Sequence, residues 1–88
     1  MSYAAILSEG IAKADLKLAQ ICRRLHKKGF SMHTSVLSKM KNGKMPPGKD
    51  ALNIALAEVL GLEPKELRIA AAKETIPGPL YNLIREVG

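Results

Sequence analysis

The sequence predicts an all-α protein, a compact bundle of about five to six short helices that includes a helix-turn-helix. Apolar residues recur at helical spacing along most of the 88 residues. No run of alternating β-branched and aromatic residues lies between turn clusters, so no sheet is expected. With two Tyr, one Phe and no Trp, the core must come from Leu, Ile, Ala, Val and Met, which suits closely packed short helices.

The first expected helix covers residues 3–13. Ser2 is placed to cap it, whereas Gly10 weakens it by about 1 kcal/mol relative to alanine. Residues 14–17 form a tight corner, where Asp15 would favour the positive N-terminus of the next helix. The predicted apolar face of the first helix consists of Tyr3, Ala4, Ile6, Leu7 and Ile11.

The next two helices form a basic pair, because residues 16–44 contain eight Lys and Arg and no Asp or Glu. The second helix should end near residues 26–28, with Gly29 supplying a left-handed exit. Phe30 or Met32 would then fill the corner. The third helix begins at residue 33 or 34 and stops at residues 42–43, an Asn-Gly pair suited to positive φ. The predicted core stripes are Leu18, Ile21, Cys22 and Leu25 on the second helix and Met32, Val36, Leu37 and Met40 on the third.

A proline-containing loop at residues 44–49 leads to a fourth helix at 51–60, with Asp50 as its cap and Gly61 just past its end. This helix is expected at the centre of the core. Pro64 is placed to open a fifth helix that runs to about residue 74. The apolar residues of these two helices are Leu52, Ala55, Leu56, Val59, Leu60, Leu67, Ile69, Ala70 and Ala71.

Residues 76–79 break the chain before a short sixth helix. We therefore expect a helix-turn-helix domain at 1–75 and a C-terminal helix at 76–88 belonging to the same domain. This last helix either packs back on the first and fifth helices or forms a self-complementary patch between two subunits. Its candidate dimer-interface residues are Leu80, Tyr81, Leu83, Ile84 and Val87.

The net charge of +6 is unevenly distributed. Residues 1–49 carry ten Lys and Arg against two acids, and residues 50–88 carry four against six. Segregated positive charge indicates a polyanionic partner for the first half, and nucleic acid is the expected one. One cysteine excludes an internal disulfide, and no signal segment or long apolar run is present. A cytoplasmic protein is expected.

Several motifs resemble one family. LAQICRRL, LSKMKNGK, a PP pair, LAEVLGL and EPKEL follow one another across about residues 16–69. The chain resembles the phage-repressor-like helix-turn-helix proteins of the lambda-repressor or Xre type. This resemblance implies a small helical bundle, sequence-specific binding to double-stranded DNA, usually as a homodimer, and a regulatory rather than enzymatic role.

The chain departs from that family in two places. Between Leu25 and Leu37 it has about five extra residues, which we interpret as a longer basic turn that extends the phosphate-contacting surface. Lys17 stands where the family often places a Ser or Thr cap, so the start of the second helix lacks a side-chain acceptor.

In a helix-turn-helix the second helix of the pair enters the major groove and its first residues meet the base edges. A lysine there can donate to guanine, and hydroxyls can bond several bases. The alternative is that Thr34 and Ser35 cap the helix and Lys39 is solvated. The predicted base contacts are His33, Thr34, Ser35, Ser38 and Lys39. The predicted phosphate contacts, for which a solvated charged face is the alternative, are Lys17, Arg23, Arg24, Lys27, Lys28, Lys41, Asn42 and Lys44.

Other kinds of site are less favoured. Cys22 and His26 have metal-ligand spacing, but no second cysteine or carboxylate completes a set, and Cys22 falls in an apolar stripe. No catalytic arrangement is recognisable, so we expect no enzyme, no metal and no cofactor. RNA binding is disfavoured because the aromatic residues are dispersed. The main alternative is a protein-interaction adaptor or antitoxin-like partner that keeps the fold and holds a partner protein through residues 80–87 or the Met32/Met40 region.

Overall fold

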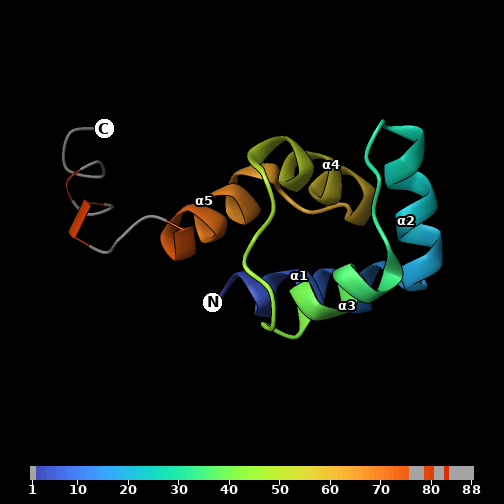
Figure 1. The fold of residues 1–88 in the computed structure, drawn as a ribbon, viewed down its shortest axis with the longest axis horizontal. Coiled ribbons are helices and arrows are strands. Elements are labelled where there is room, and N and C mark those ends of the chain that lie inside the picture. Colours follow the sequence, from blue (N-terminus) through green and yellow to red (C-terminus); the bar gives the residue numbers. More distant parts are fainter. Residues whose placement is uncertain (1, 76–78, 81–82, 84–88) are drawn as a thin grey trace.

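The protein is an all-α bundle, as the sequence predicts. A computed structural model describes residues 2–75, 79, 80 and 83 of the chain. Its regular elements in these residues, shown in Figure 1, are α1 (Tyr3–Ala14), α2 (Leu18–Lys27), α3 (Thr34–Lys41), α4 (Asp50–Leu60) and α5 (Pro64–Thr75). In this described part of the chain no helix is long and apolar enough to cross a membrane. The predicted sixth helix falls largely outside the described residues.

The core is built from leucines and isoleucine, with α4 at its centre. This helix contacts α1, α2 and α5, which confirms the central position that its apolar face predicts. The large apolar residues with no exposed surface are Leu7, Ile21, Leu25, Leu37, Leu56 and Leu67. They come from all five helices, so each helix is held by one amphipathic face.

The first helix has the predicted start but a different exit. The Ser2 hydroxyl accepts a hydrogen bond from the Ala5 N–H at 3.1 Å, which confirms the cap. The prediction that Asp15 serves the start of the next helix is wrong. Asp15 instead ends α1 in the left-handed conformation, with φ of 54°, and its N–H donates to the Ala12 carbonyl. A short polar side chain tolerates this conformation better than most.

Gly10 has a packing role that the sequence interpretation did not foresee. It is buried in the middle of α1, and a Cβ atom there would lie 2.7 Å from Leu62 Cδ1. The missing side chain therefore lets Leu62, in the α4–α5 connection, pack directly on the α1 backbone. Glycine at position 10 thus lowers the helix propensity of α1 but allows this close packing.

The start of α4 differs from the prediction, whereas the start of α5 agrees with it. Lys49 is the N-cap of α4, and Asp50 makes no side-chain cap bond. Asp50 instead accepts two hydrogen bonds from Arg68 of α5, at 2.8 and 2.9 Å. This interaction holds the pKa of the Asp50 carboxyl below its usual value. Pro64 is the first residue of α5, as expected, but Ile69 is 40% exposed rather than buried.

Candidate nucleic-acid interface

The connection between α2 and α3 is an extended segment rather than an enlarged turn. Gly29, with φ of 93°, ends α2 as predicted, and the Phe30 N–H donates to the Leu25 carbonyl at 3.0 Å. The chain then runs back along α2 toward the start of that helix (Figure 1). Phe30 and Met32 are half-buried against the core, while Ser31 between them is exposed. In an extended chain successive side chains point to opposite sides, so Phe30 and Met32 both reach the core and hold this connection against the bundle.

Helix α3 presents most of the predicted base-contacting residues to solvent. His33, Thr34, Ser35 and Lys39 are exposed, and Ser38 is half-buried. The opposite face of the helix is held by Leu37 and Met40, which are 0% and 3% exposed. A rigid helix therefore displays three short polar side chains and one lysine on one side.

The first turn of α3 is open. His33 is the N-cap and makes no side-chain cap bond. The N–H groups of Val36 and Leu37 both donate to the His33 carbonyl at 3.1 Å, whereas those of Thr34 and Ser35 come too early in the helix to have an acceptor within it. Neither hydroxyl acts as the N-cap, so this end of α3 offers backbone and side-chain donors to a ligand.

The exposed face of α2 carries a compact group of cations. Arg23, Arg24 and Lys27 are exposed, and in the described part of the chain none of them forms an ion pair. Together with Gln20 and His26 they line a shallow depression along the helix. Unpaired, exposed cations at i, i+1 and i+4 of one helix suit contact with successive phosphates.

The start of α2 is stabilised differently from the usual Ser or Thr cap. Lys17 is the N-cap and cannot accept a bond through its ammonium group. Its backbone N–H donates to Gln20 Oε1 at 2.8 Å, which is the reverse half of a capping box. The Lys17 side chain is exposed and remains a candidate phosphate contact.

Lys28 differs from the other predicted phosphate contacts. Its Nζ lies 2.8 Å from Glu58 Oε2, and both side chains are about half exposed. This ion pair joins the end of α2 to α4 and partly compensates the lysine charge. Of the predicted phosphate contacts on α2 and at its ends, Lys28 therefore has the charge that is least available to a phosphate.

The remaining predicted phosphate contacts lie at the end of α3 and just after it. Lys41 is half-buried, while Asn42 and Lys44 are exposed. Gly43, with φ of 73°, ends the helix where predicted, and the Lys44 N–H donates to the Lys39 carbonyl at 2.8 Å. This bond ties the start of the α3–α4 connection to the end of α3.

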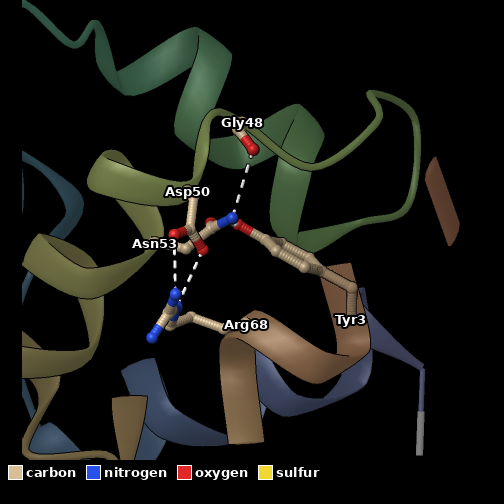
Figure 2. Close-up of polar contacts among 5 residues, drawn as sticks. All are labelled: Tyr3, Gly48, Asp50, Asn53 and Arg68. Atoms are coloured by element: carbon tan, nitrogen blue, oxygen red, sulfur yellow. Dashed lines mark hydrogen bonds and ion pairs between the residues drawn. The ribbon is translucent and has the colours of Figure 1, made fainter. Parts of the chain in front are cut away.

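The connection between α3 and α4, residues 42–49, lies over a buried polar group that was not foreseen from the sequence. Asn53 of α4 is 1% exposed, and its Oδ1 accepts a 2.6 Å bond from the Tyr3 hydroxyl. Its Nδ2 donates to the Gly48 carbonyl at 3.1 Å, as Figure 2 shows. The only sequence signal is that Asn53 stands three residues before Leu56, on the apolar face of its helix.

Cys22 belongs to the core. It is 9% exposed, and burial raises the pKa of its thiol. His26 is exposed on the outer side of the same helix. Across the described residues no group of three or more His, Cys, Asp or Glu is placed to hold a metal ion.

The predicted dimer-interface residues are only partly visible. Leu80 and Leu83 are 49% and 56% exposed, whereas Tyr81, Ile84 and Val87 lie outside the described residues. Neither leucine belongs to the described core cluster.

No protein-family model matches the sequence, and comparisons with curated proteins and with solved structures find no significant match. The case for a function therefore rests on the placement of the side chains themselves.

Proposed function

We propose that this protein is a cytoplasmic, sequence-specific DNA-binding transcriptional regulator, a repressor of phage or mobile-element type that acts as a homodimer. The observation that carries the proposal is the separation of charge over the fold. Every described acidic residue belongs to α1, α4, α5 or the connections α1–α2 and α4–α5. The segment from α2 through the α3–α4 connection contains cations and no acid.

The proposed binding mode follows from the exposed face of α3. An α-helix fits the major groove of B-DNA, where Lys39 can donate to guanine O6 and N7 and the hydroxyls of Thr34 and Ser35 can bond base edges. The cations of α2 and of the α3–α4 connection would contact phosphates on either side and set the orientation of the helix. Arg, Asn and Gln are absent from the reading face, so shape-dependent recognition contributes to specificity.

The binding experiment uses a pool of random duplexes. Sequences retained by the purified protein are enriched, and their affinity is measured by fluorescence anisotropy. We expect one enriched site, and we expect Lys39→Ala to weaken binding to it about 10-fold or more, the loss of roughly 1–3 kcal/mol typical of a base contact. Lys73→Ala is the matched control because Lys73 is an exposed lysine on α5, at the other end of the molecule from α2 in Figure 1. Failure to enrich any duplex would contradict the proposal.

A protein-interaction adaptor is the second candidate, favoured by the exposed apolar side chains away from the basic surface. Ile69, Leu80 and Leu83 are each at least 40% exposed. The same residues support the proposed homodimer. Purification from cells in high salt separates the two functions. An adaptor would retain a protein partner without DNA, whereas a homodimeric regulator would elute alone.

A further inference from the structure

We propose that Tyr3 and Asn53 are positioning residues that hold the α3–α4 connection, and with it Lys44, in the arrangement that contacts DNA. This inference rests on the proposed DNA-binding function and extends it to two buried residues that touch no ligand. It links the first residue of α1 to a loop more than forty residues away in the chain.

The α3–α4 connection is anchored at its two ends. At its start, the Gly43 and Lys44 N–H groups donate to carbonyls of α3, at 3.2 and 2.8 Å. At its other end, Gly48 accepts the bond from Asn53 Nδ2. The described hydrogen bonds include none from residues 45–47 to the rest of the chain. The middle of the connection therefore depends on its anchors.

Two consecutive prolines make the middle of the connection stiff. Pro46 and Pro47 have fixed φ angles and no N–H to donate. A stiff segment held at both ends has one position, but release of the Gly48 end would move the whole segment about residues 43–44. This movement would act on the bond from the Lys44 N–H to the Lys39 carbonyl and so change the orientation of Lys44 toward a phosphate.

The Gly48 anchor requires a particular orientation of the Asn53 amide. A carboxamide has one acceptor and one donor end. The Tyr3 hydroxyl, which donates to Oδ1 at 2.6 Å, fixes the acceptor end toward α1 and leaves Nδ2 facing Gly48 (Figure 2). Burial keeps the phenol protonated, because it raises the pKa of Tyr3 to about 12. Without the phenol, Oδ1 would be buried and unpaired, and rotation of the amide toward another donor would break the bond to Gly48.

The Gly48 end is also closely packed. A Cβ atom at Gly48 would lie 2.6 Å from Leu52 Cδ2 and 3.7 Å from Met40 Cε. The backbone there passes directly over side chains of α4 and α3. The bond from Asn53 thus holds the connection at a point where helix α3 is also in contact.

Hydrogen exchange in the free protein tests the positioning without DNA. The Lys44 N–H is the amide of residues 44–49 with a described acceptor, the Lys39 carbonyl. Tyr3→Phe and Asn53→Ala should each raise its exchange at least several-fold, while the amides of α2 keep the wild-type rate. The double variant should exchange no faster than Asn53→Ala, because both residues act through one bond. Val59→Ala truncates a half-buried side chain in the last turn of α4, at the other end of that helix from Asn53, and should leave the Lys44 N–H unchanged. Wild-type exchange of the Lys44 N–H in both single variants would overturn the inference.

Affinity for the enriched duplex tests the link to DNA. Tyr3→Phe should weaken binding by about 3- to 10-fold and make its salt dependence shallower, whereas Val59→Ala should change neither at a temperature where it is folded. Unchanged DNA affinity together with faster exchange of the Lys44 N–H would overturn the claim that Tyr3 and Asn53 act on DNA binding through the α3–α4 connection. If the wild-type protein enriched no duplex, the DNA-binding function would fail, yet the exchange data would still decide whether the two residues position the loop.

Discussion

Tyr3 shows how one side chain serves packing, hydrogen bonding and ionisation at once. Its ring is 2% exposed, and its hydroxyl donates to Asn53. Its backbone N–H donates to Glu74 Oε2 at 2.7 Å, which places a carboxylate at the positive N-terminus of α1. Burial, with a smaller contribution from that carboxylate, raises the pKa of the phenol to about 12.

The raised pKa makes stability depend on pH in alkaline solution. The unfolded chain releases the Tyr3 proton near pH 10, whereas the folded chain keeps it until about pH 12. The unfolded state therefore binds fewer protons between these values, and the free energy of unfolding falls as pH rises. Denaturant unfolding from pH 9 to 11 should show a steeper decline for wild type than for Tyr3→Phe. Parallel declines would contradict the assignment.

Loss of the phenol should also be costly at neutral pH. Tyr3→Phe leaves Asn53 Oδ1 buried without its donor, which costs about 1–3 kcal/mol. Tyr3→Phe combined with Asn53→Leu removes both partners and should recover part of that loss. Thermal unfolding of the wild type, the two single variants and the double variant measures it, and additive losses in the double variant would count against a shared bond.

At the scale of elements, the sequence predicts the helices well and the connections less well. Apolar periodicity, Ser2, Gly29, Pro64 and Gly61 define helix faces and ends through local chemistry, and these expectations agree with the structure. Long-range partners are not encoded locally. The bond between Tyr3 and Asn53 joins residues 50 apart, and Asp50 bonds Arg68 rather than its own helix.

The candidate site shows the same division. Exposure of Arg23, Arg24, Thr34 and Lys39 follows from helical spacing and was predicted from it. The path of the α2–α3 connection back along α2 was not predicted, because the sequence indicates only that the connection is long. Pairing of Lys28 with Glu58 depends on how α2 packs on α4, which periodicity alone does not specify.

The exit from α2 gives a prediction at this scale. Gly29 has φ of 93°, with nothing within 4 Å of an added Cβ. Gly29→Ala should therefore destabilise the protein by about 1–2 kcal/mol through backbone strain alone. Gly29→Asn should lose less, because asparagine tolerates this conformation. Chemical denaturation compares them, and equal stability of all three chains would show that the left-handed exit is not required.

At the scale of the molecule, the basic helix α2 and the exposed Ile69 occupy different regions. Helix α2 lies at the opposite end of the described helices from α5 in Figure 1, and α5 carries Ile69. This separation would let one surface bind DNA while another joins two subunits. Symmetric pairing matches a two-fold related site in DNA.

The proposed dimer is tested by changing the two described leucines. Leu80→Ser combined with Leu83→Ser should convert a dimer into a monomer, because both side chains are about half exposed and available to a second copy. Met45→Ser, which changes another exposed apolar residue, is the control and should leave the dimer intact. Sedimentation velocity gives the answer, and a dimer that survives the paired substitution would place the interface elsewhere.

The measurement that tests the central claim most directly is the salt dependence of binding to the enriched duplex. About five phosphates neutralised per subunit predict a slope of log K against log salt of about −4.5 per subunit. Arg24→Ala should make this slope shallower by about 0.9, and Lys73→Ala should leave it unchanged. A slope near zero, or the same slope in all three chains, would contradict the assignment of the basic surface of α2 and α3 to DNA.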